Sequence, residues 1–280
     1  MSELQNAAAP SLKKPPAWLF ALGYNSMPAE FELQGRRYRF HKLFKHDFYA
    51  ATGLYRPVPP AAASDSASTL PPSDDAPTAA WAVLKIQRTF PLWGLPMRRL
   101  GAMVANHEIR ILRKLQGIAG IPEFLGTLGS NGYIHAYVPG RDLSPDCHPN
   151  ADFFRELQDL FSAIHARHVA YVDANKRENI LYGDDHHPWL IDFQISFNCR
   201  KNQDDNFVAR AILKRLQAED RYHYYKHKTR LAPEICHADD FARANHQSWY
   251  IRVHRAFAQP IIHCRRRFLA RYKSRANTEG

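Results

Sequence analysis

With 280 residues, of which 45% are hydrophobic and 23% charged, the chain has the composition of a globular protein large enough to bury a core. No apolar run approaches the roughly 20 residues that span a bilayer, and no segment resembles a signal peptide, so we expect neither a membrane-spanning nor a secreted protein but a cytoplasmic one. The net charge of +11 is uneven, because residues 200–280 hold 18 Lys and Arg against 8 Asp and Glu, which indicates an anionic partner for that end.

The first part of the chain combines two low-complexity segments with a predicted hairpin. Residues 1–17 are rich in Ala, Pro and Lys, and we expect a flexible tail there. Residues 36–55 are rich in aromatic and other β-favouring residues, which predicts two strands joined by a turn near 45–47. Residues 57–79 consist mainly of Pro, Ala, Ser and Asp. This composition cannot form a packed core and predicts a disordered insertion.

A strand, a helix and a second strand are predicted next. The short apolar run over 81–86 predicts a strand that carries one lysine, Lys85. Residues 102–115 predict an amphipathic helix with Glu108 on its inward face. Residues 133–138 predict another strand, which Pro139 and Gly140 end.

The spacing of apolar residues in the rest of the chain predicts mostly helices. Residues 151–167 carry apolar side chains at helical spacing, and two short strands over 180–182 and 189–191 are separated by turn residues. From about residue 206 onward the spacing of Val208, Ile212 and Leu216 is again helical. Strands first and helices afterwards predict an α+β fold with two unequal lobes.

Five polar side chains occupy positions that core building alone does not explain. Lys85 lies within an apolar strand, and Glu108 lies on the inward face of the next helix. Asp173 follows a long helix, Asn179 begins a strand, and Asp192 ends one. A buried charge is costly unless it is paired or holds a ligand. Residues of these types suit the binding of nucleotide phosphates and magnesium.

The order of these residues resembles that of protein kinases. Residues 165–181, from His165 through Asp173 to Asn179-Ile-Leu, resemble the catalytic loop, and Asp192-Phe-Gln resembles the magnesium-binding D-F-G motif. Lys85 resembles the strand lysine of that family and Glu108 its helix partner. The resemblance implies a two-lobed protein-kinase-like fold. We expect an N-terminal lobe over 18–139, with a small antiparallel sheet and one helix, and a larger, mainly helical C-terminal lobe over 140–280 with a basic helical end.

The resemblance implies roles on the nucleotide side of the site. Lys85, held by Glu108, would neutralise the α- and β-phosphates of ATP. Asn179 and Asp192 would ligate magnesium through hard oxygen atoms. ATP and magnesium are therefore the expected cofactors.

The resemblance also implies roles for residues beside the attacking hydroxyl of the acceptor and for residues beside the adenine of ATP. Asp173 would accept or orient the proton of the attacking hydroxyl, and Lys176 would replace the usual lysine of the catalytic loop. Tyr137 and Val138 resemble the hinge between the lobes, where backbone groups would hydrogen-bond adenine.

The catalytic motifs depart from the protein-kinase pattern. Tyr171 and Val172 replace the histidine and arginine of H-R-D, and Gln194 replaces the glycine of D-F-G. The spacing from Asp173 to Asn179 is one residue longer than usual, so we expect the extra residue to bulge out of the loop. Control by loop phosphorylation is not expected, because the arginine that would bind the phosphate is missing.

The loop expected to cover the phosphates contains no glycine. It corresponds to residues 44–49, where Lys45 or His46 could contact phosphates in place of backbone amides. The missing glycines, the longer catalytic loop and Gln194 keep open the alternative of a pseudokinase with a regulatory role. A protein Ser/Thr kinase is a second alternative.

The departures are closer in character to the bacterial lipopolysaccharide kinases, which phosphorylate heptose or Kdo sugars of the lipid A core. That looser resemblance implies transfer of a phosphoryl group from ATP to a sugar hydroxyl of an anionic glycolipid. The basic C-terminal region could meet such a lipid at the inner face of the membrane, or could simply be a solvated helix face. Nucleic acid is not an expected partner, because no nucleic-acid-binding module is visible.

Overall fold

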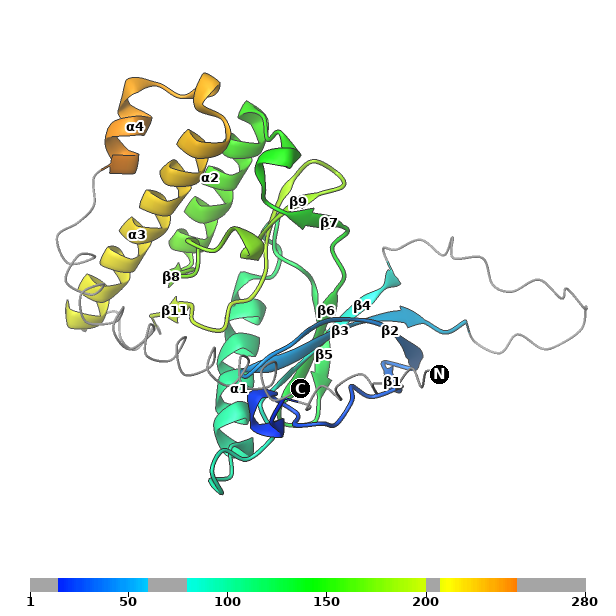
Figure 1. Cartoon of the computed structure of the whole chain (residues 1–280). Helices are drawn as coiled ribbons and strands as arrows, with labels where there is room; N and C mark the ends of the chain where they lie inside the picture. The colour runs from blue at the N-terminus through cyan, green and yellow to red at the C-terminus, as the bar shows by residue number, and fades with distance from the viewer. Residues whose placement is uncertain (1–14, 60–79, 200–206, 246–280) are drawn as a thin grey trace, which may run out of the picture.

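The computed structural model describes residues 15–59, 80–199 and 207–245 of the chain. Over these ranges it is an α+β protein in which a six-stranded antiparallel sheet comes first, and helices with two small sheets follow. Figure 1 shows the large sheet at one end of the molecule and most of the helices at the other. The predicted tail over 1–17 and the predicted insertion over 57–79 fall mostly outside the described residues, as does the last part of the basic C-terminal region. In the part of the chain that is described, no helix is both long enough and apolar enough to cross a bilayer.

The large sheet has the strand order β1-β2-β3-β4-β6-β5, and every neighbouring pair is antiparallel. The hairpin expected over 36–55 is confirmed, with its turn between His46 and Ala50. The strands expected over 81–86 and 133–138 are confirmed as β4 and β6. The sequence pattern did not predict β1 or β5, which are edge strands of four and five residues. The six strands are β1 (Glu30–Leu33), β2 (Arg36–His46), β3 (Ala50–Pro57), β4 (Ala82–Gln87), β5 (Phe124–Leu128) and β6 (Gly132–Ala136).

The two faces of strand β4 meet different surroundings, because successive side chains of a strand point to opposite faces. On one face Leu84 packs into an apolar cluster with the segment before β1 and with strands β1, β2, β3 and β6. On the other face Lys85 reaches helix α1 and contacts Glu108. The members of the apolar cluster are Leu22, Met27, Phe31, Tyr38, Ala51, Tyr55, Ala82, Leu84 and Ile134.

Helix α1 begins at Arg98, four residues earlier than expected, and ends at Leu115 as expected. Glycine weakens a helix interior, but at Gly101 it allows a close approach to the end of β4. A Cβ atom at that position would lie 2.1 Å from the carbonyl oxygen of Arg88. The predicted inward face is confirmed, since four of its members are buried: Ala105, Glu108, Leu112 and Leu115.

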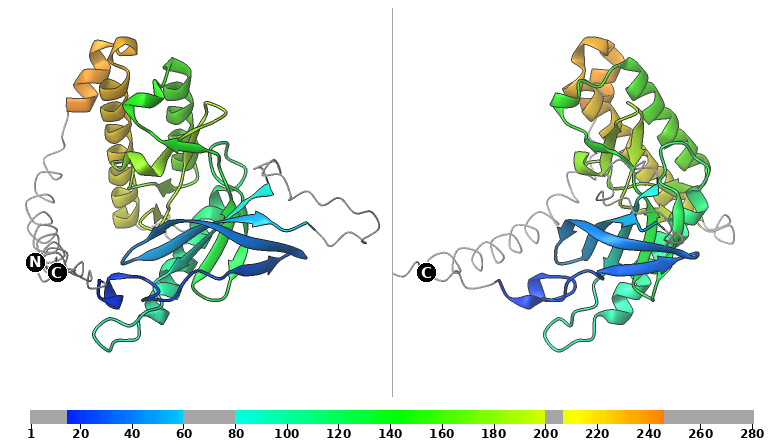
Figure 2. Two further views of the ribbon diagram at one scale, coloured as in Figure 1. Left: turned by 45° about the vertical axis from the view of Figure 1, so that its right-hand side comes forward. Right: turned by 90° about the vertical axis from the view of Figure 1, so that its right-hand side faces the viewer.

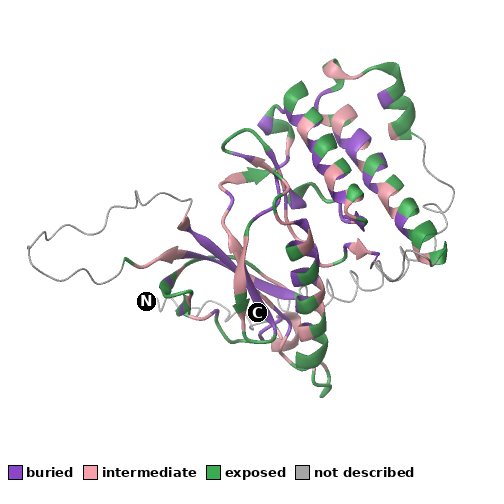
Figure 3. Ribbon diagram, turned by 180° about the vertical axis from the view of Figure 1, so that it is seen from behind, coloured by how far each residue is buried: buried purple, intermediate pink, exposed green. Residues whose placement is uncertain are grey.

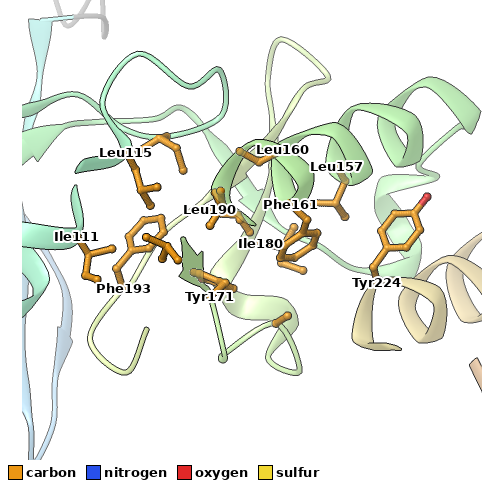
Figure 4. Close-up of a cluster of buried hydrophobic side chains, with 14 of the residues drawn as sticks. Ile111, Leu115, Leu157, Leu160, Phe161, Tyr171, Ile180, Leu190, Phe193 and Tyr224 are labelled. Carbon is orange, nitrogen blue, oxygen red and sulfur yellow. The ribbon is translucent and has the colours of Figure 1, made fainter. Parts of the chain in front are cut away.

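The larger hydrophobic core joins α1 to the helical end of the molecule (Figure 4). There Phe193 lies beside α1, and its ring centroid is 5.2 Å from that of Tyr171. Helix α2 is confirmed close to its predicted range, and the side chain of Asn150 caps it by accepting a hydrogen bond from the Phe153 amide at 2.9 Å. The helices are α1 (Arg98–Leu115), α2 (Ala151–Ala166), α3 (Phe207–Leu231) and α4 (Ala238–Asn245). Short 3-10 turns cover Ala17–Leu19, Pro145–Cys147, Arg177–Asn179 and Pro233–Ile235.

Two small sheets lie between the large sheet and the helices. The hairpin expected over 180–182 and 189–191 is confirmed as β9 and β10, and β7 pairs with the other edge of β9. The second small sheet pairs β8 with β11. Their bounds are β7 (Gly140–Asp142), β8 (Val169–Ala170), β9 (Ile180–Gly183), β10 (Pro188–Leu190) and β11 (Phe197–Asn198).

Helix α3 lies beside α2 in both views of Figure 2, and of the three apolar residues at helical spacing Leu216 packs inward. Val208 and Ile212 are 62% and 43% exposed. The residues that pack inward are largely polar or aromatic, because this face meets α2, β8 and the turn after β8. They include Leu213, Asp220, Tyr224 and His227.

Candidate active site

Lys85 lies at the centre of the site. Its ammonium nitrogen is 2.8 Å from Oε1 of Glu108 and 2.8 Å from Oδ1 of Asp192, and its side chain is only 8% exposed. Burial alone would lower the pKa of Lys85, but the two carboxylates raise it above its ordinary value. The lysine therefore stays charged and joins three elements that are far apart in the sequence: β4, α1 and the segment after β10.

The carboxylate of Glu108 is fully buried and accepts several hydrogen bonds. Besides Lys85, it accepts a bond from Nε2 of Gln87 at 2.9 Å and from the backbone amide of Phe193 at 3.1 Å. A buried carboxylate is tolerated only when it is paired and hydrogen-bonded in this way. Glu108 thus fixes both the lysine and the segment that carries Asp192 to helix α1.

Asp192 occupies an unusual backbone position at the end of the β9–β10 hairpin. Its φ of +61° is in the left-handed region, which aspartate adopts more readily than most residues. Burial raises the pKa of Asp192, but the charge and hydrogen bond of Lys85, together with Lys176, bring it below its ordinary value. The side chain is 29% exposed, so an ionised carboxylate is accessible from solvent there.

Asp173, Lys176 and Asn179 form a second group. The ammonium of Lys176 and the side-chain amide of Asn179 both donate to Oδ2 of Asp173, at 2.7 and 2.8 Å. A 3-10 turn over Arg177–Asn179 ends this loop and places Asn179 beside Asp173. Burial lowers the pKa of Lys176, but the hydrogen bond and charge of Asp173 raise it overall.

Tyr171 holds the two groups together. Its hydroxyl donates to the carbonyl oxygen of Ile191 and lies 3.2 Å from the carbonyl oxygen of Asn179. The amide of Ile191 also donates to that Asn179 carbonyl at 3.1 Å. Because Asp192 directly follows Ile191, the structure brings all five residues of the predicted constellation, and Lys176, to one place.

Asp220 of α3 is a supporting residue that the sequence pattern did not reveal. It is fully buried, and its carboxylate accepts hydrogen bonds from the backbone amides of Tyr171 and Val172, both at 2.8 Å. Its Oδ2 atom also lies 3.0 Å from Nε2 of His165. Val172 has a φ of +71°, which is strained for a β-branched residue, so Asp220 holds the chain in an unfavourable conformation just before Asp173.

The oxygen atoms of the site fit magnesium. Asp173 engages the amide nitrogen of Asn179, which leaves the amide oxygen of Asn179 as the atom that can face a cation. Lys85 binds one oxygen of Asp192. Among the described residues no group of three or more His, Cys, Asp and Glu could hold a metal. A donor set of one carboxylate and one amide suits magnesium, which keeps several waters and takes its other ligands from phosphates.

The predicted hinge offers one backbone amide rather than two. The amide of Tyr137 already donates to the carbonyl oxygen of Trp81 at 3.0 Å. The amide of Val138, by contrast, has no hydrogen-bond partner within the described ranges. Beside it, Tyr137 packs on an apolar cluster of Leu54, Trp81 and Val83. Of the two hinge residues, Val138 is thus the one able to donate to a base.

The turn between β2 and β3 is organised by an aspartate. The carboxylate of Asp47 accepts hydrogen bonds from the amides of Tyr49 and Ala50 at 2.8 and 3.0 Å, and it pairs with Lys45 at 3.0 Å. His46 does not face a phosphate site, because its Nε2 atom accepts a bond from the Leu22 amide at 3.2 Å. The Asp47 carboxylate therefore already binds the amides of Tyr49 and Ala50, which a phosphate would otherwise contact.

Two cavities lie away from the site. One of about 260 Å³ opens between α2 and α3 beside His165 and Arg221, and one of about 670 Å³ lies beside β2 near Met27 and Phe40. His46 lines the larger cavity, but neither cavity is lined by Lys85, Glu108, Asp173, Asn179 or Asp192.

No family model and no curated protein matches this sequence. The class that fold and site define is an α+β protein in which a buried Lys–Glu–Asp linkage lies beside an Asp–Lys–Asn cluster.

Two histidines, buried His227 and partly buried His135, predict that the protein loses stability in mild acid. Burial lowers the pKa of His135 and of His227 to about 4, although each ring also bonds a backbone carbonyl. The unfolded chain, in which histidine has a pKa near 6.5, then binds more protons than the folded chain as the pH falls from about 6.5 to about 4. We expect each histidine to cost about 2 kcal/mol of unfolding free energy between pH 7 and pH 5.

Urea unfolding at the two pH values measures this loss. His227→Gln should flatten the pH dependence, whereas His237→Gln, at an exposed position, should leave it unchanged. An unaltered pH dependence in His227→Gln would contradict the assignment.

Proposed function

We propose that this protein is an ATP- and magnesium-dependent phosphotransferase on a two-lobed protein-kinase-like fold, with residues 18–139 and 140–280 as its lobes. The observation that carries the proposal is the contact of the Lys85 ammonium with both Glu108 and Asp192. A lysine held in this way is a fixed positive charge beside an ionised carboxylate, which is what binding a metal-bound triphosphate requires.

Each residue then has a defined task. Lys85 binds phosphate oxygens while Glu108 keeps its side chain in place. Asn179 and Asp192 hold magnesium, which supplies charge neutralisation to the transferred phosphoryl group. Val138 donates its amide to the adenine base, and the apolar cluster beside it covers the base.

Transfer itself depends on the second group. Asp173 accepts a hydrogen bond from the acceptor hydroxyl and orients it toward the phosphorus atom. Lys176, which already contacts Asp173, neutralises charge that develops on the transferred group. Positioning and charge neutralisation provide most of the catalysis in such a site.

The proposed acceptor is a sugar hydroxyl of a lipopolysaccharide-type glycolipid rather than a protein. Only residues 193–206 separate Asp192 from helix α3, and part of that segment pairs as β11 with β8. Little chain is left there to dock an extended peptide, which disfavours a protein Ser/Thr kinase.

A pseudokinase is the second candidate, and the β2–β3 turn favours it. The Asp47 carboxylate engages the turn amides that would otherwise contact phosphates. Nucleotide binding without turnover would support this reading.

Thermal denaturation with Mg-ATP tests the proposal. A ligand at about 100 times its Kd stabilises the folded state by about 2.7 kcal/mol, which raises Tm by several degrees in a protein of this size. We expect this increase in the native chain and in Lys42→Met, an exposed control on β2, but not in Lys85→Met. The measured quantity is the change on adding nucleotide, because Lys85→Met also alters the Tm of the free protein. Equal increases in native and Lys85→Met proteins would contradict the proposal.

A further inference from the structure

Residues 91–96 form a tight hairpin before α1 with an exposed apolar tip. Leu92 and Leu95 exchange backbone hydrogen bonds of 3.1 and 2.9 Å across it. Trp93 and Gly94 form the turn, and both have positive φ, 48° and 80°. Trp93 is 77% exposed and Leu95 64% exposed. In Figure 3 this loop and the adjoining end of α1 form an exposed tip of the molecule.

The backbone of the hairpin is strained in order to display the tryptophan. A bulky residue in the left-handed region is a rare outlier, and glycine would adopt the same turn without cost. Such strain persists where the surrounding structure serves a function. The hairpin therefore presents a large aromatic side chain to solvent at a cost in stability.

The apolar surface continues onto the first turns of α1. Leu100 and Met103, three residues apart and thus on one side of the helix, are 50% and 67% exposed. Single exposed apolar residues are ordinary, but a contiguous group of large ones indicates a binding surface.

Within residues 88–115 the exposed charges are all positive. Arg98 and Arg99 follow the hairpin directly, and Arg110 and Arg113 lie farther along the exposed side of α1. The single acid between residues 88 and 115 is Glu108, which is fully buried and paired. An exposed tryptophan with aliphatic neighbours and an arginine border matches the headgroup region of an anionic bilayer.

We propose that the hairpin over 91–96 and the first turns of α1 dock this protein on the surface of an anionic phospholipid bilayer, with Trp93 and Leu95 inserted at headgroup depth. The hairpin projects outward, as an inserting element must, and between residues 88 and 115 no exposed acidic residue would repel a negative surface. The inference does not depend on the phosphotransferase assignment, because it concerns a different surface and does not involve nucleotide.

Vesicle sedimentation of the full chain tests the docking. We expect binding to phosphatidylcholine vesicles that contain phosphatidylglycerol, and much weaker binding to phosphatidylcholine alone. Trp93→Ser should lower the partition constant about tenfold or more. Phe241→Ser, which removes an aromatic side chain of 41% exposure on α4, should leave it unchanged. Because Trp93 is exposed, its variant keeps the fold, which urea unfolding verifies.

A quenching experiment distinguishes insertion of Trp93 into the bilayer from electrostatic binding of the basic C-terminal region to the bilayer surface. Lipids brominated on their acyl chains should quench tryptophan fluorescence of the native protein, and Trp93→Phe should bind but show much less quenching. The proposal is wrong if anionic vesicles do not bind the native chain, or if Trp93→Ser binds them equally well. It is also wrong if the native chain is a dimer that Trp93→Ser dissociates without any effect on vesicle binding, since a second copy would then occupy the surface.

Discussion

The Asp173→Asn variant is expected to bind Mg-ATP like the native chain but to transfer the phosphoryl group about a thousandfold more slowly. Asparagine has the shape of aspartate and can still accept a hydrogen bond from Lys176 or Asn179, so the loop should keep its conformation. It carries no negative charge, however, and cannot take or orient the proton of an attacking hydroxyl.

The loss can be measured without knowing the acceptor, by following ATP hydrolysis and, with lipopolysaccharide core acceptors, radiolabelled phosphate transfer. The matched control is Asp152→Asn, which removes an exposed carboxylate from the first turn of α2. Nucleotide binding is checked by the Tm increase with Mg-ATP, which should persist in Asp173→Asn. If turnover by the variant equals that of the native chain, Asp173 has no role in transfer. If the native chain binds nucleotide but shows no turnover, the protein is a pseudokinase.

The Asp192→Asn variant should lose magnesium-dependent nucleotide binding, whereas Asp173→Asn should lose phosphoryl transfer. Asp192→Asn removes the ionised carboxylate that contacts Lys85, so the nucleotide-dependent rise in Tm should lose its dependence on magnesium. The two aspartates can thus be distinguished by which step fails, although they lie in one site.

The sequence predicted the residues of the candidate site better than it predicted Asp220, which holds the loop before Asp173 in place. Lys85, Glu108 and Asp192 each interrupt a local apolar pattern, and a buried charge needs a partner, so their convergence follows from the cost of burial. Asp220 gives no such signal, because α3 places few apolar residues on its inward face and the carboxylate bonds to backbone amides rather than to a matching charge.

The elements of the fold also divide into those that the sequence predicted and those that it did not. Periodicity predicted α1 and α2, each of which buries one face, and the enrichment in β-favouring residues predicted the β2–β3 hairpin. Periodicity missed the edge strands β1 and β5, because four and five residues are too few to show a clear apolar pattern. On α3 the spacing of Val208 and Ile212 indicated a helix but not its buried face, because packing against α2 selects the side with Leu213 and Tyr224.

Loss of the Asp220 carboxylate should produce a large decrease in stability. In Asp220→Ala, the amides of Tyr171 and Val172 and the ring of His165 lose a common acceptor in a region where water cannot replace it. Removing one partner from a buried charged network typically costs about 3–5 kcal/mol. We therefore expect a decrease of that size in the free energy of unfolding, measured in urea.

The same change should disturb catalysis even where the protein stays folded. Without Asp220 the amide of Val172 loses the acceptor that stabilises its strained φ of +71°, so Asp173 should move relative to Asn179. Asp220→Asn retains one acceptor oxygen and should recover part of both the stability and the rate. Asp159→Ala, an exposed carboxylate on α2, should change the unfolding free energy by less than about 0.5 kcal/mol. A decrease in Asp220→Ala no larger than that of Asp159→Ala would mean that the loop before Asp173 is held by Tyr171 and its neighbours alone.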